Sequence, residues 1–287
     1  MRVEGDAQLE ALVELGRRAG ARAEELYAEH GRGALEVEEK SPGNPVTRAD
    51  RELDRMLSEA IRSAYPEAGV VSEESVPTAA ALFDELAKDE VFFLDPIDGT
   101  REFLERNGEF AVMVGLARGG RASAGVVVVP AHRLLLAGRV GQRAFVEHPD
   151  GRRDLLAVTS IERFDEARML VSRAHRPPLV EPLRRRLGIG RLLPCGSVGV
   201  KVSRIVLGQG DLYVHAGRGL SLWDTCAPGA ILAAAGGRMT DLDGLPIDYR
   251  GPTGLSRGLV ASNGALHPGV MSAVAWAERE VARTSPR

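Results

Sequence analysis

The N-terminal segment carries apolar residues at the spacing of an amphipathic helix. They recur every three or four positions with charged residues between them, at Leu9, Leu12, Val13, Ala19, Ala23 and Leu26. A second helix is predicted from Thr47 through Ile61. It follows residues 41–45, whose two prolines and one glycine indicate a mobile loop.

Short apolar runs typical of strands fill the middle of the chain. They cover 69–72, 91–94, 110–117, 125–129 and 134–137. Residues 79–87 fit a short helix, and Gly119-Gly120 predicts a hairpin. The segment 101–110 is polar, and the residues around 148–151 resemble a turn. An antiparallel meander is therefore expected.

From about Ile161 the pattern alternates between helix and strand. Strands are expected over 169–172, 192–193, 211–215, 239–242 and 259–262, and helices over 179–187, 198–207, 223–236 and 270–281. This change of character predicts two lobes. An N-terminal α+β lobe would cover 1–155, and a C-terminal α/β lobe would cover 156–287.

Length and charge limit the class of protein. At 287 residues, the chain can form one large domain or two of ordinary size. Its 37 Lys and Arg residues against 40 Asp and Glu residues give a formal net charge of −3. No broad cationic field is expected, which disfavours nucleic acid and anionic membranes as partners.

The two cysteines and the apolar runs bear on location. Cys195 and Cys226 have no CxxC or Cys/His spacing, so we interpret them as buried reduced thiols rather than zinc ligands. This favours a cytoplasmic protein. The N-terminus lacks the apolar core of a signal peptide, and no stretch approaches the roughly 20 apolar residues of a membrane helix.

The stretch VFFLDPIDGT places two carboxylates directly after an apolar run. Asp95 is expected where the strand ends, and Asp98-Gly99 at a tight turn. Together with the Ile97 carbonyl, the two carboxylates form an all-oxygen set suited to a hard divalent cation, and the amides of Gly99 and Thr100 suit an anion. Taken alone, the stretch fits an ordinary surface turn equally well.

Other acidic residues have structural explanations of their own. Asp50 completes a capping box with Thr47, Glu73-Glu74 resembles a solvated pair, and Asp224 suits a helix N-cap with Pro228 in the first turn. These explanations are independent of one another. A single site at the ends of the predicted strands and helices explains the joint arrangement better.

Four motifs carry a resemblance to a known family. GNPVTRAD, VVSEES, DPIDGT and SLWDTCAPGAILAAAGG, in this order, resemble the inositol monophosphatase family of magnesium-dependent, lithium-sensitive phosphatases, from about Leu9 to Val281. The resemblance implies an α/β fold, the two-lobed α-β-α-β-α sandwich of the inositol monophosphatase and fructose-1,6-bisphosphatase superfamily.

Further segments are similar to the 3′(2′),5′-bisphosphate nucleotidase branch, the CysQ type. They are DGTREFLERNGEFAV, WDTCAP, SRAH at 172–175 and GSVGVK at 196–201. Two departures stand out: Gly229 occupies a position where these relatives commonly carry glutamate, and GSVG replaces the GSSL of some bacterial relatives. The glycine at position 229 affects packing or the fit of the substrate. The GSVG difference affects which leaving group is preferred.

The resemblance assigns roles residue by residue. Glu73, Asp95 and the Ile97 carbonyl would hold one Mg²⁺, and Asp95, Asp98 and Asp224 a second. A third, weaker ion would rest on Glu73. Asp50 and Thr100 would orient and deprotonate the attacking water, with Glu73 counted among the catalytic residues. The substrate-binding set would be Gly99, Thr100, Ser172, Arg173, His175, Gly196, Ser197 and Lys201.

The implied reaction removes the 3′-phosphate of adenosine 3′,5′-bisphosphate to give AMP and phosphate, which would clear a by-product of sulfate assimilation. The sulfated nucleotide is a second candidate substrate. The alternative is a phosphatase for inositol 1-monophosphate or another sugar phosphate. Judged singly, Arg173, His175 and Lys201 fit ordinary surface charge. A non-hydrolysing binding protein is disfavoured because the full ligand set is present, and a homodimer is a further expectation.

Overall fold

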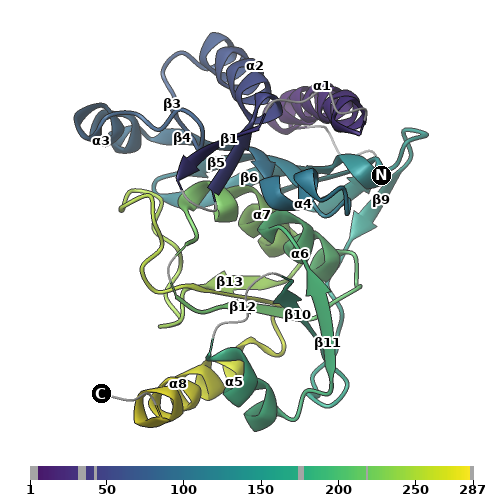
Figure 1. Cartoon of the computed structure of the whole chain (residues 1–287), viewed down its shortest axis with the longest axis vertical. Coiled ribbons are helices and arrows are strands. Elements are labelled where there is room, and N and C mark those ends of the chain that lie inside the picture. The colour runs from purple at the N-terminus through teal and green to yellow at the C-terminus, as the bar shows by residue number, and fades with distance from the viewer. Residues whose placement is uncertain (1–5, 32–36, 42–43, 174–177, 218, 285–287) are drawn as a thin grey trace.

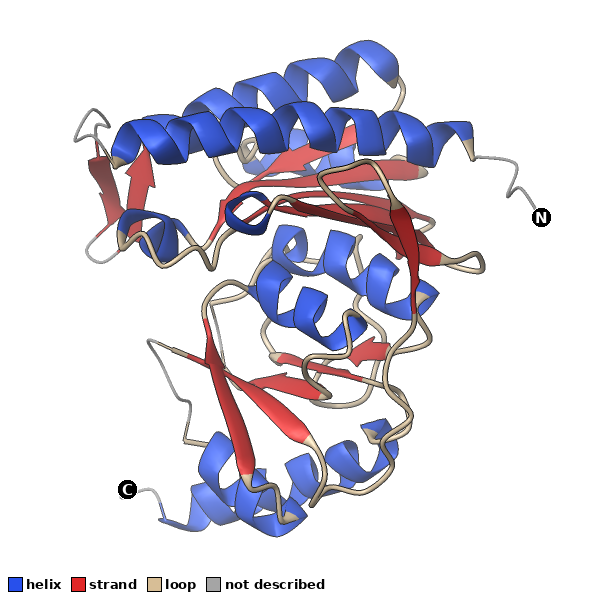
Figure 2. Ribbon diagram, turned by 90° about the vertical axis from the view of Figure 1, so that its right-hand side faces the viewer, coloured by secondary structure: helices blue, strands red, loops and turns tan. Residues whose placement is uncertain are grey.

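Five layers alternate pairs of helices with sheets (Figure 1, Figure 2). The computed structural model describes residues 6–31, 37–41, 44–173, 178–217 and 219–284. The outer layer holds α1 (Ala7–His30) and α2 (Arg48–Ala64), which pack on a seven-stranded sheet. Helices α6 (Val198–Val206) and α7 (Leu222–Ala234) separate this sheet from a five-stranded one. The predicted layered α/β sandwich is confirmed.

The seven-stranded sheet follows the order of the chain. Its strands are β3 (Gly69–Ser72), β4 (Glu90–Asp98), β5 (Ala111–Arg118), β6 (Arg121–Val129), β7 (Leu134–Arg139), β8 (Ala144–Glu147) and β9 (Arg153–Leu156). Strand β3 runs parallel to β4 through the connecting helix α3 (Ala79–Ala87), and every later pair is antiparallel. The meander and its Gly119-Gly120 hairpin are confirmed.

The five-stranded sheet is mixed. Its spatial order is β11 (Arg191–Cys195), β10 (Arg168–Ser172), β12 (Leu212–His215), β14 (Leu259–Ser262) and β13 (Arg238–Thr240). Strand β10 is parallel to β11 and β12, whereas β14 is antiparallel to its neighbours. Helices α5 (Val180–Leu187) and α8 (His267–Thr284) form the last layer. The predicted alternation of helix and strand is confirmed here, while a lobe boundary at 155 stays a prediction.

Two glycines allow α7 to approach the seven-stranded sheet closely. A Cβ atom at Gly115 of β5 would lie 2.5 Å from the Ala227 nitrogen, and one at Gly125 of β6 would lie 2.4 Å from the Ala227 carbonyl oxygen. No larger residue fits either position without displacing the helix backbone. This close packing carries Asp224, in the first turn of α7, to the vicinity of β4.

Several local predictions are wrong. The loop expected over 41–45 is partly a ribbon of β1 (Val37–Ser41) and β2 (Asn44–Thr47), with residues 42–43 outside the described part of the chain. Pro45 is tolerated because β2 pairs with one strand only. Strand β4 also continues past Asp95, which pairs with Met113. A bulge then leads to the Asp98–Ala111 pair.

Two helices also differ from expectation. The polar segment after Gly99 begins with α4 (Thr100–Leu104), whose Phe103 is buried against Tyr27 and Phe110. In α7 the N-cap is Ser221 rather than Asp224, and Pro228 lies inside the helix rather than in its first turn. Pro228 therefore offers no N–H to the Asp224 carbonyl one turn earlier.

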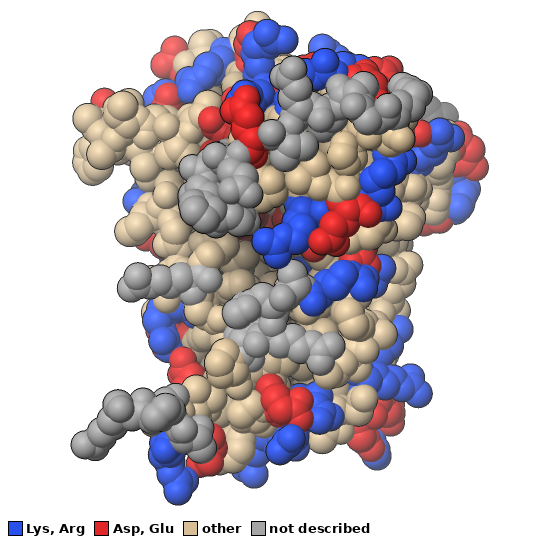
Figure 3. Space-filling view, viewed as in Figure 1, with Lys and Arg blue, Asp and Glu red and all other residues tan. Residues whose placement is uncertain are grey.

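Both cysteines are buried and free, as predicted. Across the described residues, no helix combines the length and apolar character needed to span a membrane. Acidic and basic side chains are interspersed on the face shown in Figure 3.

Candidate metal centre and active site

Three aspartates converge between the two sheets. Asp95 and Asp98 come from β4 and Asp224 from α7, and each offers a carboxylate oxygen within 4.8 Å of the others. Asp95 is fully buried, at 0% exposure. The bulge after Asp95 and the close packing of α7 thus bring together groups separated by more than a hundred residues.

The environment of Asp95 is suited to a cation. Neither of its oxygens accepts a hydrogen bond from any described residue. Burial raises the pKa of Asp95 well above its usual value, and the charges of Glu73 and Asp98 add to that effect. The pKa of Asp224 is raised for the same reasons, with Asp98 as its main neighbouring charge. A buried carboxylate without donors that is clustered with two others needs a counter-charge, and an all-oxygen set fits a hard divalent ion.

Asp98 is held by the N-terminus of α6. Its Oδ2 atom accepts hydrogen bonds from Ser197 Oγ and the Gly199 amide, both at 2.5 Å, and its Oδ1 atom accepts one from the Val198 amide at 3.2 Å. Ser197 adopts a φ of +49°, an uncommon conformation for a non-glycine residue. The carboxylate of Asp98 is therefore oriented by donors from the second half of the chain.

Asp50 caps α2 and also contacts Thr100. Its Oδ2 atom accepts hydrogen bonds from the Thr47 amide at 2.7 Å and the Thr47 hydroxyl at 2.6 Å, so the predicted capping box is present. Thr100 Oγ1 lies 3.2 Å from Asp50 Oδ1 and 3.3 Å from the Ile97 carbonyl oxygen. Burial raises the pKa of Asp50. Capping thus leaves one oxygen of Asp50 available to the site.

Glu73 lies at the edge of this acidic group. It lines the same cavity as the three aspartates, and its charge raises the pKa of Asp95 and Asp224. Its amide donates to the Leu94 carbonyl at 3.1 Å, which keeps the end of β3 beside β4. Among the described residues, the acidic group whose carboxylate oxygens lie within 4.8 Å of one another consists of the three aspartates and does not include Glu73. Glu74 does not line the cavity.

The site opens into a cavity of about 340 Å³. Most residues that the sequence assigned to the site line it: Glu73, Asp95, Ile97, Asp98, Gly99, Thr100, Ser172, Ser197, Lys201 and Asp224. Asp50, Arg173 and Gly196 do not line it, and His175 lies outside the described residues.

Sequence reasoning missed part of the lining: Pro45, Arg101, Glu102, Val198, Tyr213, His215, Gly219 and Leu220. Two signals could have found some of them. Arg101 and Glu102 follow DGT directly, and His215 ends a strand parallel to the one that ends at Ser172. Ligand-binding residues gather at such carboxyl ends of parallel strands.

Lys201 is a buried cation in the cavity wall. It is 3% exposed, its Nζ atom donates to the Ser197 carbonyl at 2.8 Å, and Nζ lies 4.9 Å from the centroid of the Tyr213 ring. Burial lowers the pKa of Lys201, and the negative charge of Asp98 opposes this effect. The cavity lining therefore combines five carboxylates with the Lys201 ammonium group and the Arg101 guanidinium; the carboxylates are those of Glu73, Asp95, Asp98, Glu102 and Asp224.

Comparison with known sequences identifies relatives over most of the chain. A model of the inositol monophosphatase family matches residues 6–278. The 3′(2′),5′-bisphosphate nucleotidase CysQ of Escherichia coli (strain K12) is 30% identical over 241 residues, which cover 84% of this chain and 93% of that protein. The 3′(2′),5′-bisphosphate nucleotidase 1 of Homo sapiens is 26% identical, and the match covers 82% of this chain and 83% of that protein.

Solved structures share the fold. A Thermotoga maritima IMPase has a TM-score of 0.78 at 25% identity, and the match covers 96% of this chain and 99% of that one. CysQ from Bacteroides thetaiotaomicron, described as a bacterial member of the inositol monophosphatase family, has a TM-score of 0.70 at 22% identity, over 91% of this chain and 98% of that one.

Proposed function

The chain belongs to the inositol monophosphatase family, and from this premise we propose that it removes the 3′-phosphate of adenosine 3′,5′-bisphosphate, giving AMP and phosphate, in a Mg²⁺-dependent reaction. The sulfated nucleotide is a second candidate substrate. Metal dependence is supported by one observation: the buried carboxylate of Asp95 accepts no hydrogen bond from a described residue and lies beside Asp98 and Asp224.

The carboxylates would hold the metal ions. Asp95, Asp98 and Asp224 supply one group of oxygens, and Glu73 with the Ile97 carbonyl would extend that group for further ions. A phosphate monoester resists attack because its negative charge repels a nucleophile. When bound, Mg²⁺ neutralises phosphate oxygens and makes water more acidic.

Asp50 and Thr100 would handle the proton of the attacking water. The Thr100 hydroxyl can donate to Asp50 Oδ1, 3.2 Å away, and accept a proton from water through its lone pairs. Burial raises the pKa of Asp50, which makes its carboxylate a better base near neutral pH. The proton would thus pass through Thr100 to Asp50.

Two observations support a nucleotide rather than an inositol phosphate. The cavity contains a buried ammonium group, Lys201, in addition to the acidic cluster, and a substrate with a second phosphate needs such a cation. In addition, relatives matching more than four fifths of the chain are named 3′(2′),5′-bisphosphate nucleotidases. A cytoplasmic location and a homodimer stay predictions from sequence.

The test is a panel of substrates assayed for released phosphate with excess Mg²⁺. Adenosine 3′,5′-bisphosphate should give a kcat/KM at least about tenfold above that of inositol 1-phosphate, a difference of about 1.4 kcal/mol in transition-state binding. Faster turnover of inositol 1-phosphate would favour the alternative. Absence of phosphate release from every substrate would remove the enzymatic proposal.

A further inference from the structure

The carboxylate of Glu109 lies at the meeting point of three segments that form the site. Glu109 precedes β5 and is 6% exposed. It accepts hydrogen bonds from Arg173 Nε at 3.0 Å, Arg173 Nη2 at 2.8 Å and the Gly196 amide at 2.7 Å. One buried side chain thereby joins the segment after β10 to the turn between β11 and α6.

The pair with Arg173 is bidentate and fixes the plane of the guanidinium. Arg173 has 46% of its side chain exposed, whereas Glu109 has 8%. Among the described residues, the Arg173 guanidinium donates through Nε and Nη2 to Glu109 and through Nη2 to the Pro194 carbonyl at 3.4 Å, so its Nη1 end can bind an anion. Bidentate pairing orients an arginine far better than a single contact does.

Two arginines contact the carboxylate of Glu109, and Glu102 is a further acidic neighbour of Arg173. Arg204 Nη2 lies 3.5 Å from Glu109 Oε1, so two guanidinium groups share one carboxylate. Although burial acts to raise it, the pKa of Glu109 is lowered, mainly by the hydrogen bonds from Arg173 and the Gly196 amide, with a smaller contribution from the charge of Arg204. The pairing therefore orders two guanidinium groups beside the cavity while Glu109 offsets only one of their two charges, which favours an anionic ligand.

Glu109 also supports the wall of the cavity. The Gly196 amide that it holds precedes Ser197, whose carbonyl accepts from Lys201 Nζ at 2.8 Å. On the other side, a Cβ atom at Gly99 would lie 3.1 Å from the Glu109 carbonyl oxygen. Glu109 therefore contacts both loops on which the cavity is built.

We propose that Glu109 is a positioning residue for substrate selection. It holds Arg173 in place before the substrate binds, and so favours substrates that carry a second anionic group beside the phosphate removed. This inference rests on the proposed function and deepens it. A purely structural role would tie the same loops together but would affect all substrates alike.

The experiment compares adenosine 3′,5′-bisphosphate with adenosine 3′-monophosphate, which lacks only the second phosphate. In Glu109→Gln we expect kcat/KM for the bisphosphate to fall about tenfold, mainly through KM, and the value for the monophosphate to fall much less. An equal loss on both substrates, or no loss on either, would overturn the proposal. The unsubstituted protein tests the proposed function separately, through its preference over inositol 1-phosphate.

A double-mutant cycle tests whether Glu109 acts through Arg173. In the Arg173→Ala background, Glu109→Gln should leave the ratio of the two kcat/KM values within about twofold, because the group that it positions is gone. A tenfold change in that background would contradict the proposal. Should Glu109→Gln fail to fold, Arg173→Lys replaces it: lysine keeps the charge but loses the bidentate pair, and should lose most of the selectivity. Full selectivity in Arg173→Lys would then overturn the inference.

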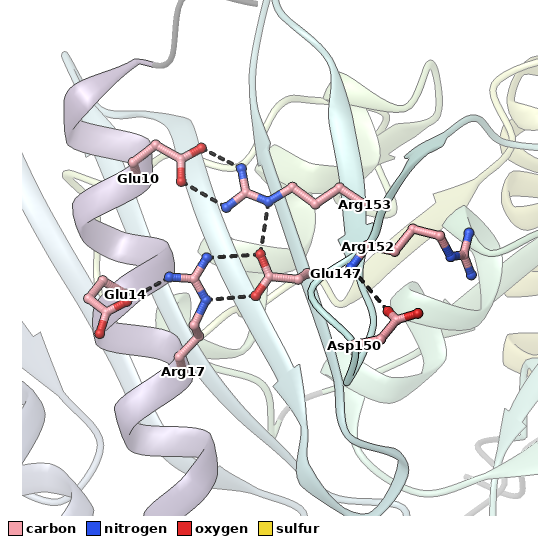
Figure 4. Close-up of polar contacts among 7 residues, drawn as sticks. All are labelled: Glu10, Glu14, Arg17, Glu147, Asp150, Arg152 and Arg153. Atoms are coloured by element: carbon pink, nitrogen blue, oxygen red, sulfur yellow. Dashed lines mark hydrogen bonds and ion pairs between the residues drawn. The ribbon is translucent and has the colours of Figure 1, made fainter.

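Glu147 offers a matched control. It is 8% exposed, accepts hydrogen bonds from two arginines, Arg17 and Arg153 (Figure 4), and does not line the cavity. Glu147→Gln removes the same charge from a comparable cluster. It should lower the free energy of unfolding and leave the ratio of the two kcat/KM values unchanged.

Discussion

Thr100 Oγ1 lies 3.2 Å from Asp50 Oδ1, although 50 residues separate them in the sequence. Their contact joins the first turn of α2 to the first residue of α4. The other oxygen of Asp50 caps α2 through Thr47, so one side chain serves both the helix and the site. Because Oδ2 caps the helix and Oδ1 contacts Thr100, the contact with Thr100 can be tested without removing the cap.

Loss of the Thr100 hydroxyl should affect turnover much more than stability. We expect Thr100→Val to lower kcat by about 10²- to 10³-fold, because proton transfer to Asp50 is interrupted. Thr100→Ser keeps the hydroxyl and should retain most of the activity. The control is Asp6→Ala, which removes the N-cap of α1 and should lower stability by about 1 kcal/mol without lowering kcat. Turnover of Thr100→Val within threefold of the starting value would contradict the role.

Asp95→Asn should stabilise the metal-free protein while abolishing its response to Mg²⁺. Removal of one charge from a buried group of three carboxylates relieves repulsion, so we expect the free energy of unfolding at pH 7 to rise by about 1 kcal/mol. The rise in Tm that excess Mg²⁺ gives the unsubstituted protein should disappear, together with activity. Thermal unfolding with and without Mg²⁺ measures both effects. An undiminished Mg²⁺-dependent shift in Asp95→Asn would refute the assignment of Asp95 as a ligand.

Lys201→Met should preserve the fold and weaken nucleotide binding. Burial disfavours the ammonium group, so an apolar side chain of similar length should cost less than about 1 kcal/mol of stability. The KM for adenosine 3′,5′-bisphosphate should rise about tenfold, because one charged contact to a phosphate is lost. Steady-state kinetics on this nucleotide and on inositol 1-phosphate provide the measurement. Unchanged selectivity would exclude Lys201 from substrate recognition.

The Glu147 cluster predicts a loss of stability in acid (Figure 4). Hydrogen bonds from Arg17 lower the pKa of Glu147 to about 2 in the folded protein, against an ordinary value of 4.5. The carboxylate therefore contributes stability that is fully present above about pH 4.5 and is lost as pH falls toward 2. Because solvent screens the partly exposed arginines, we expect this contribution to the free energy of unfolding to be only about 1 to 2 kcal/mol.

The pH dependence should appear in the difference in unfolding free energy between the unsubstituted protein and Glu147→Gln. Urea unfolding at pH 7 should find the variant less stable by that amount, and the gap should narrow between pH 4 and pH 2 because protonation removes the same charge. A gap that stays constant over this range would show that the ion pairs contribute nothing.

Gly229 should tolerate alanine but not glutamate. Gly229 is buried in α7, and a Cβ atom there would lie 3.1 Å from the Met239 sulfur, the flexible end of a side chain. Alanine should gain up to about 1 kcal/mol from helix propensity. Glutamate would place a charge against Met239 and Tyr249 and should cost about 2 kcal/mol or more. Chemical denaturation checks both variants, and a glutamate variant as stable as the alanine one would contradict this account.

The sequence predicted most of the elements because their signals are local. Helical spacing located α1, apolar runs separated by glycines located the meander, and the motif set identified the family. Predictions failed where tertiary contacts override local preference. Pro45 lies in a strand because β2 pairs with one neighbour only, and α4 forms where Phe103 is buried against Tyr27 and Phe110.

The candidate site was predicted as a set of residue types rather than as an arrangement. Capping by Asp50 and its contact with Thr100 look like alternatives along the chain, but one carboxylate has two oxygens and makes both contacts. Glu109 lies in the DGTREFLERNGEFAV segment, but that segment does not reveal its contacts, because its partners Arg173 and Gly196 are 64 and 87 residues away.

By itself, the sequence determined the layered fold and the family, since periodicity, turn residues and motif order are written along the chain. Only the tertiary structure decided which oxygens meet. The bulge in β4 and the glycine contacts of α7 bring Asp95, Asp98 and Asp224 together. The distances between these carboxylates depend on how closely the backbones of elements distant in sequence pack against one another. No local sequence pattern specifies that packing.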